Sequence, residues 1–188
     1  PDVVAATYRS MNASDLGAWF RSARADLLLT FGGLEGKERV PWFGPEISVT
    51  SSATARLMET WAHAQDLFDA FALERPATDR IKHIAHLGVR TMGFSFVLNE
   101  RPVPDLPVRV ELEAPSGVLW TWGADNARDS VTGTALDFCL VVTQRRNLAD
   151  TSLTVDGAVA GEWMSIAQAF AGAPGPGRAP AEAARRVS

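Results

Sequence analysis

The chain has 188 residues, of which 46% are hydrophobic, and its 22 acidic residues outnumber its 18 basic residues for a formal net charge of -4. A chain of this size can bury enough apolar surface for one large domain or two small ones. It has no excess of positive charge to neutralise the phosphates of nucleic acids or anionic lipids. We therefore expect a small-molecule substrate, and neither nucleic acid nor a membrane as a partner.

Cys139 is the single cysteine, and it lies in the apolar run 136–142. A lone cysteine forms no disulfide framework, and in such a run it is more often a core residue than a reactive thiol. No stretch approaches the about 18 apolar residues that span a membrane, and the first residues lack the pattern of a secretory signal. We expect a cytoplasmic protein.

The first half of the chain has helical periodicity. Apolar residues recur at three- and four-residue spacing, and a loop with two prolines at 41–45 interrupts the pattern because proline lacks a backbone donor. Gly88 and Gly93 weaken the last of these segments without forbidding a helix. The predicted helices span about residues 2–11, 15–30, 51–71 and 79–98.

After the proline-rich segment 102–107 the apolar period changes to two, because Val108, Val110 and Leu112 alternate with charged residues. This alternation is typical of a half-buried strand. A turn and a second apolar run at 118–122 predict a β-hairpin.

The remainder of the second half is predicted to contain a connection or third short strand, a buried helix, a last strand and a closing helix, at about 127–131, 134–143, 151–155 and 158–169. From residue 173 onward the proline- and glycine-rich composition need not fold. The sequence therefore predicts an α+β protein with a helical bundle in residues 1–100, a small α/β domain in 101–172 and a flexible tail in 173–188.

Glu59 and His63 are the candidate metal ligands. They lie four residues apart on the predicted helix 51–71, so both side chains project from the same face. A carboxylate oxygen and an imidazole nitrogen at this spacing can bind one zinc ion. Asp66, three residues further on, could orient the imidazole through its other nitrogen. Spacing alone is weak evidence, since many solvated helix faces carry such pairs.

The segment 54–66, which contains Glu59 and His63, resembles the metal-binding helix of the mycothiol-dependent maleylpyruvate isomerase branch of the DinB superfamily. The resemblance covers nearly the whole chain and implies a DinB-like helical bundle, zinc or another divalent metal at Glu59 and His63, and mycothiol as a candidate thiol cofactor. Its other segments are 40–45 (VPWFGP), 121–123 (TWG), 131–133 (VTG) and 143–146 (TQRR).

One departure from the family concerns the third metal ligand. The resemblance implies a histidine from an upstream bundle helix, but residues 1–30 contain no histidine. Either the first helix is missing from this chain or the site is incomplete, and we expect the former because the chain begins at Pro1 without a methionine. His83 and His86 lie three residues apart and are a second candidate pair of metal ligands. Histidine pairs at this spacing are more often surface or packed residues than ligands.

The resemblance also implies that Arg145 lies near the active site, where its guanidinium would hold a carboxylate of the substrate or cofactor in a bidentate fork. Arg146 could take that role instead, or both could simply close a helix. Trp120 and Trp122 share one face of a strand and are expected to pack in the core.

Two functions remain open at this point. The first is a zinc-dependent enzyme of thiol-linked isomerase or transferase type, with Glu59 and His63 as metal ligands and Arg145 as a catalytic residue. The second is a non-enzymatic small-molecule binding protein in which the metal is structural or absent.

Overall fold

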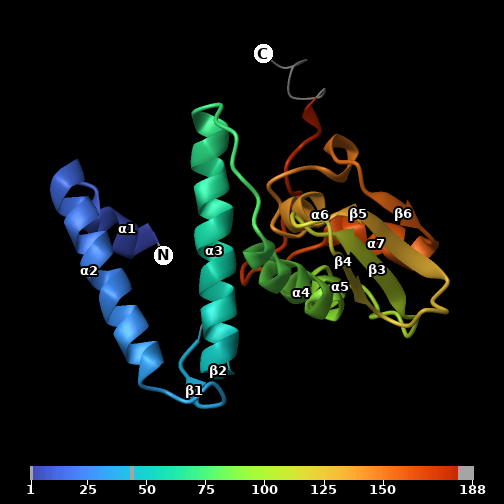
Figure 1. The fold of residues 1–188 in the computed structure, drawn as a ribbon, viewed down its shortest axis with the longest axis horizontal. Coiled ribbons are helices and arrows are strands. Elements are labelled where there is room, and N and C mark those ends of the chain that lie inside the picture. Colours follow the sequence, from blue (N-terminus) through green and yellow to red (C-terminus); the bar gives the residue numbers. More distant parts are fainter. Residues whose placement is uncertain (1, 43–44, 182–188) are drawn as a thin grey trace. The chain divides into compact units, whose positions relative to one another are not determined.

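The computed structural model of this chain describes residues 2–42 and 45–181 (Figure 1). The chain divides into two compact units, residues 1–53 and 54–188. The predicted domain ranges, 1–100 and 101–172, stay a prediction. Among the described residues there are seven α-helices and two small sheets. None of these helices is long and apolar enough to cross a membrane.

The first unit contains two helices and a small hairpin. Helices α1 (Asp2–Tyr8) and α2 (Ala13–Gly32) confirm the first two predicted helices, with ends that differ by a few residues. The Asn12 side chain caps α2 by accepting the Asp15 backbone N–H at 2.9 Å. The short strands β1 (Arg39–Val40) and β2 (Ile47–Ser48) pair antiparallel and were not predicted. Residues 43–44 of the predicted loop lie outside the described residues.

Helix α3 (Val49–Ala70) confirms the strongest helix prediction. Its residues Met58, Trp61, Ala62 and Gln65 follow helical spacing and are all buried. The first three belong to the main hydrophobic core of the second unit. One face of α3 is therefore fixed against that core, and the polar residues Glu59, His63 and Asp66 flank it.

The prediction of one helix over 79–98 was wrong in its continuity. A short 3₁₀ turn (Asp79–Ile81) leads into α4 (Lys82–Arg90), and α5 (Met92–Leu98) follows after a break at Thr91. The Thr91 hydroxyl donates to the carbonyls of Leu87 at 3.0 Å and Gly88 at 3.1 Å. Such bonds to the preceding turn bend a helix, and apolar periodicity does not report them.

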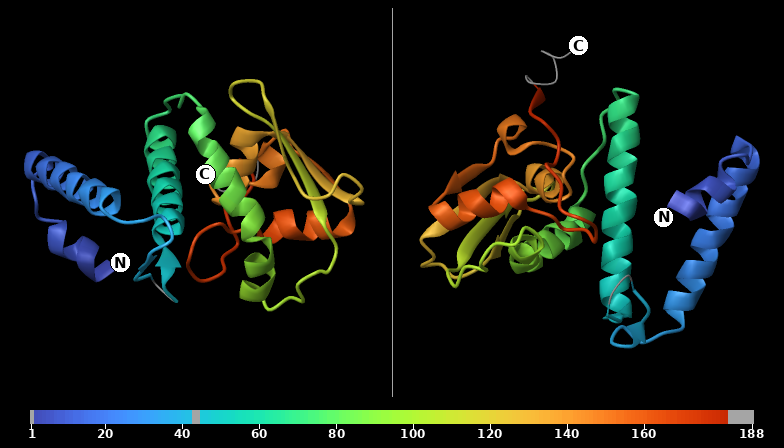
Figure 2. Two further views of the ribbon diagram at one scale, coloured as in Figure 1. Left: turned by 60° about the horizontal axis from the view of Figure 1, so that its bottom comes forward. Right: turned by 180° about the vertical axis from the view of Figure 1, so that it is seen from behind.

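The second unit is built on a four-stranded sheet of order β4-β3-β5-β6 (Figure 2). Strands β3 (Val108–Glu113) and β4 (Leu119–Trp122) form the predicted antiparallel hairpin. Strand β5 (Asp129–Thr134) pairs parallel with β3, and β6 (Thr154–Asp156) pairs antiparallel with β5. Residues alternate between buried and more exposed along β3, so helices cover one face of the sheet.

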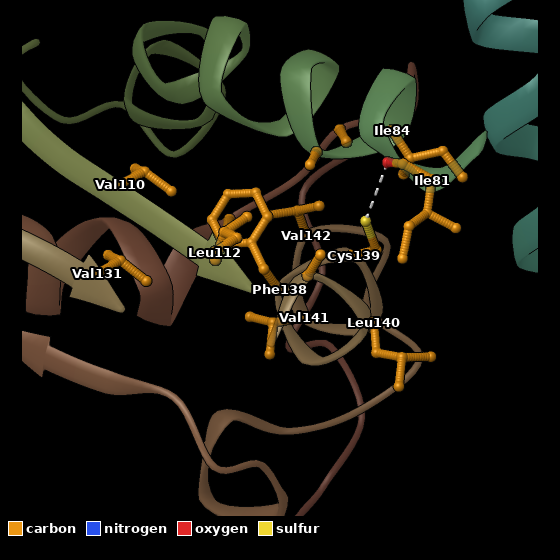
Figure 3. Close-up of a cluster of buried hydrophobic side chains, with 14 of the residues drawn as sticks. Ile81, Ile84, Val110, Leu112, Val131, Phe138, Cys139, Leu140, Val141 and Val142 are labelled. Atoms are coloured by element: carbon orange, nitrogen blue, oxygen red, sulfur yellow. Dashed lines mark hydrogen bonds between the residues drawn. The ribbon is translucent and has the colours of Figure 1, made fainter. Parts of the chain in front are cut away.

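The core lies between this face and the helices α4, α5, α6 (Ala135–Val142) and α7 (Ala158–Ile166). Figure 3 shows side chains from α4, α6 and two strands converging on Phe138. Cys139 is fully buried, as predicted, with its sulfur 3.5 Å from the Ile81 carbonyl oxygen. Burial raises the pKa of this thiol far above its ordinary value, so Cys139 is a packing residue and not a nucleophile.

The predicted tail, 173–188, extends beyond the described residues from 182 onward. Its described part has no helix or strand over residues 173–180, but it is hydrogen-bonded to the unit. The Asn147 side chain donates to the Arg178 carbonyl at 2.9 Å, and the Asp150 carboxylate accepts the Ala181 backbone N–H at 3.0 Å. These bonds hold Arg178 in place.

Gly88 marks the closest approach of α4 to α6. A Cβ at this position would lie 2.8 Å from a Val142 methyl and 3.0 Å from the Phe138 ring. We expect Gly88→Ala to destabilise the protein by about 1–3 kcal/mol in urea unfolding, because the core is already filled there. Gly93→Ala is the matched control in α5, since its Cβ would meet only Val103 at 3.5 Å. The control should be neutral or gain up to about 1 kcal/mol of helix propensity. Equal effects at both sites would contradict this packing.

Candidate functional site

Glu59 and His63 lie side by side on α3. The Glu59 Oε2 and His63 Nε2 atoms are 3.5 Å apart, and the two side chains are 40% and 70% exposed. Two neighbouring ligands of a tetrahedral zinc ion, each about 2.1 Å from the metal, are about 3.4 Å apart. The pair therefore fits two adjacent coordination positions of one metal ion.

A complete set of three protein ligands is not found among the residues that the structure describes. Asp66 lies on the other side of the imidazole, with its Oδ2 atom 3.5 Å from His63 Nδ1. This is the side on which a carboxylate orients a metal-binding histidine, although 3.5 Å is long for a hydrogen bond. Asp66 is therefore placed to support His63 and not to complete a shared metal site with Glu59.

Arg145 lies against both His63 and Asp66. Its Nε and Nη2 atoms donate to the two carboxylate oxygens of Asp66 at 3.2 and 2.9 Å, and its Nη1 donates to the Thr143 carbonyl at 2.7 Å. The Nη2 atom also lies 3.4 Å from His63 Nδ1. The predicted proximity of Arg145 to His63 is thus observed, while its catalytic role stays a prediction.

The end of α6 determines where Arg145 points. Gln144 has a left-handed backbone with φ of 59°, which is uncommon outside glycine. The Gln144 backbone N–H donates to the Val141 carbonyl at 2.8 Å, and the Arg145 backbone N–H donates to the Leu140 carbonyl at 2.7 Å. These two bonds form a Schellman motif, which ends a helix by reversing the chain direction. The helix end therefore directs both arginines that follow it toward α3.

Arg146 and Arg178 hold a second carboxylate on α3. Arg146 binds Asp69 through both Nη atoms at 2.6 Å each, and Arg178 Nη1 binds it at 2.9 Å. The Arg178 Nη2 atom also lies 3.6 Å from Asp66 Oδ1. We call Asp66, Asp69, Arg145, Arg146 and Arg178 the arginine cluster. Its three guanidinium groups against two carboxylates leave one positive charge, which Glu59 beside His63 offsets.

The pKa values in the cluster follow from these bonds. The bidentate hydrogen bonds from Arg146 hold the pKa of Asp69 well below its ordinary value, against the opposing effect of burial, and Gln65 and Arg178 contribute in the same direction. The same pairing raises the pKa of Arg146. Both groups are therefore charged at neutral pH, as a structural ion pair requires.

The second candidate pair of metal ligands lies elsewhere. His83 and His86 are exposed on α4, and His86 Nδ1 accepts a hydrogen bond from the Trp122 indole at 3.2 Å. Trp120 is buried in the core, as predicted, while Trp122 is only partly buried and packs against the core. In the described residues neither histidine belongs to a group of three potential metal ligands.

Asp69 and Arg178 are cluster residues that the sequence did not indicate. Asp69 could have been found, because it lies three residues after Asp66 on the same helix and the two arginines 145 and 146 are adjacent. Arg178 had no such signal. It lies in a proline- and glycine-rich segment whose composition is typical of chains without fixed structure.

Comparison with known proteins supports the family resemblance seen in the sequence. Residues 2–68 match the family model described as mycothiol maleylpyruvate isomerase N-terminal domain. The match covers about a third of the chain and is consistent with the predicted DinB-like assignment.

Two curated proteins of Mycobacterium tuberculosis are similar to the chain, uncharacterized protein MT0041 of strain CDC 1551 / Oshkosh and uncharacterized protein Rv0036c of strain ATCC 25618 / H37Rv. Each is 53% identical over 140 residues, which cover 74% of this chain and 54% of the relative. The chain thus spans about half the length of these relatives. No solved structure matches it.

The pairing of Asp69 predicts a specific dependence of stability on pH. The depressed pKa of Asp69 means that its contribution is fully present above the ordinary carboxyl pKa of about 3.9 and is lost as pH falls below it. We expect Asp69→Asn to lower the free energy of unfolding at pH 7 by about 1–3 kcal/mol, because Arg146 loses its charged partner.

The mutant should also lose less stability than the wild type when urea unfolding is repeated between pH 5 and about 2.5. Asp105→Asn, at an exposed aspartate outside the cluster, is the control and should follow the wild type at every pH. Parallel pH curves for wild type and Asp69→Asn would contradict the role of this pair.

Proposed function

We propose that this chain is part of a metal-dependent enzyme of thiol-linked isomerase or transferase type that acts on a small molecule. The family match supports a protein related to the mycothiol-dependent isomerases. The observation that carries the proposal is the 3.5 Å separation of the Glu59 and His63 donor atoms, with Arg145 beside the same imidazole. Zinc is the first metal to test. Mycothiol is the first thiol to test, because the description of the matching family names mycothiol.

In this proposal Glu59 Oε2 and His63 Nε2 hold the metal. A nitrogen and a carboxylate oxygen are donors that suit zinc, and a catalytic site normally adds a third protein ligand and one open position. When bound, the metal supplies a Lewis acid that polarises a carbonyl or stabilises a thiolate near neutral pH. The third donor is not among the described residues.

His63 and Asp66 have complementary tasks around one ring. For Nε2 to bind a metal, the ring proton must reside on Nδ1, which lies 3.5 Å from Asp66 Oδ2. In this tautomer the 3.4 Å contact between Nδ1 and the Arg145 Nη2 donor is not a hydrogen bond. A carboxylate in this position holds the tautomer and increases the donor strength of the imidazole. A modest movement of Asp66 toward the ring would complete this hydrogen bond.

Arg145 acts first as a positioning residue in this scheme. Its Nε and Nη2 edge is occupied by Asp66 and its Nη1 donates to Thr143. A free bidentate fork, which the resemblance implied for binding a substrate carboxylate, is therefore already used inside the protein. Arg145 holds Asp66 in place beside His63 and places positive charge at the Nδ1 side of the imidazole.

Zinc titration followed by calorimetry tests the metal site directly. With two protein donors this chain should bind zinc weakly, and Glu59→Gln or His63→Gln should weaken binding further, because each removes one of the two ligands. Matched controls are Glu113→Gln and His83→Gln, two exposed residues outside the site that should leave the affinity unchanged.

The longer relative Rv0036c, which includes sequence beyond the part this chain matches, should bind zinc more tightly if it supplies the third donor. Zinc binding that is unaffected by both Glu59→Gln and His63→Gln would refute the proposed ligands. A tight site in the short chain that survives only with His86 or Asp66 intact would move the metal to those residues.

A non-enzymatic binding protein is the second candidate, favoured by the lack of a three-donor group in the described part of the chain. The two candidates differ in a simple outcome. If the metal is absent, neither this chain nor the longer relative binds zinc. If the metal is structural, zinc binds, but the Glu59→Gln variant retains any small-molecule binding of the wild type.

A further inference from the structure

Arg75 lies in the connection between α3 and the 3₁₀ turn at 79–81, which runs back alongside α3 (Figures 1 and 2). Its Nη1 atom donates to the Trp61 carbonyl at 2.6 Å. The guanidinium carbon lies 5.0 Å from the centroid of the Trp61 ring and 5.6 Å from that of Phe68. Both distances are within the range of cation–π contacts, so aromatic faces hold the charged group in a defined orientation.

A cleft of about 250 Å³ adjoins Arg75. Leu57, Trp61 and Pro76 supply apolar walls, and two threonines and a second arginine, Arg80, complete the lining. The cleft lies on a different side of α3 from the candidate metal site, because residues 57 and 59 are two apart and point in nearly opposite directions from a helix.

No aspartate or glutamate pairs with Arg75 or Arg80 in the described ranges 2–42 and 45–181, whereas each arginine of the arginine cluster has a carboxylate partner. In the same ranges the bond to Trp61 is the one hydrogen bond that Arg75 makes. Its Nε and Nη2 donors therefore face no protein acceptor there. This edge of a guanidinium has the geometry that binds a carboxylate in two parallel hydrogen bonds.

The charge on Arg75 is also partly withdrawn from water. Desolvation lowers the pKa of its guanidinium from the ordinary value, although the group stays protonated in any physiological range. A partly buried charge without a counterion lowers stability, and a bound anion would offset this cost. The apolar walls would in turn remove the body of such an anion from water.

We propose that this cleft binds a small organic monoanion, a carboxylate on an apolar body about the size of one ring. The carboxylate binds the Nε and Nη2 donors of Arg75, the body packs against Leu57, Trp61 and Pro76, and Arg80 adds a second positive charge at the rim. The volume of about 250 Å³ lies at or below the lower end of typical ligand pockets, which limits the body to about one ring. This site is independent of the proposed metal chemistry.

Benzoate is the probe, and benzamide is its neutral counterpart of the same shape. Binding is followed through the indole resonances of the tryptophans in two-dimensional NMR spectra, with the Trp61 signal assigned by Trp61→Phe. We expect benzoate to shift the Trp61 signal in a saturable manner and benzamide to bind at least about tenfold more weakly, because benzamide cannot form the charged pair with the guanidinium.

Arg75→Gln should weaken benzoate binding about tenfold or more while leaving the weak binding of benzamide unchanged. Arg75→Lys keeps the charge but loses the fork, so an intermediate affinity is expected. Arg90→Gln, at an exposed arginine in the last turn of α4, is the control and should bind like the wild type. The dispersion of the NMR spectrum reports whether each variant is folded.

Equal binding of benzoate and benzamide would overturn the proposal, because the charge would then have no role. It would also fail if Arg75→Lys, folded and still cationic, bound benzoate no better than Arg75→Gln. Absence of any benzoate binding to the wild type would likewise overturn the proposal. Zinc titration of Arg75→Gln separates this result from the metal proposal, since Glu59 and His63 remain intact.

Discussion

The second unit depends on two carboxylates of α3 being held by the two arginines that follow α6. Arg145 binds Asp66 and Arg146 binds Asp69, each through two donors. Hydrophobic burial of the adjoining face of α3 sets the distance between the elements, but burial has no direction. The paired forks supply direction, because planar guanidinium and carboxylate groups bind only in a narrow range of orientations. His63 owes its surroundings to this arrangement, since the same guanidinium that fixes Asp66 also touches the imidazole.

Much of the fold could be predicted because the apolar period is regular. The change from helical spacing to alternation near Val108 located the hairpin, and Met58, Trp61 and Ala62 identified the buried side of α3. The break at Thr91 could not be found in this way, since it arises from a hydroxyl that bonds to the preceding turn. The parallel pairing of β3 with β5 could not be predicted either, because the apolar spacing within a strand does not indicate which other strand it pairs with.

For the site, predictability depended on whether residues are close in sequence. Glu59 and His63 are four apart, so helix geometry alone brings them together. Arg145 was placed by family resemblance, and its contact with His63 depends on the left-handed residue Gln144, which no periodicity indicates. Arg75 and Arg178 carried no signal at all, because each acts from an irregular segment. Contacts made by such segments are a property of the tertiary structure.

Asp66 lies between Arg145 and His63, and both groups compete for its carboxylate. Its Oδ2 atom is 2.9 Å from Arg145 Nη2 and 3.5 Å from His63 Nδ1, so a stronger bond to one group weakens the bond to the other. Thermodynamic reciprocity then applies. An anion that binds Arg145 and loosens its hold on Asp66 releases the carboxylate toward His63, and a ligand that engages Nε2 of the imidazole favours that anion to the same degree. Two ligands that never touch would thus bind cooperatively through one carboxylate.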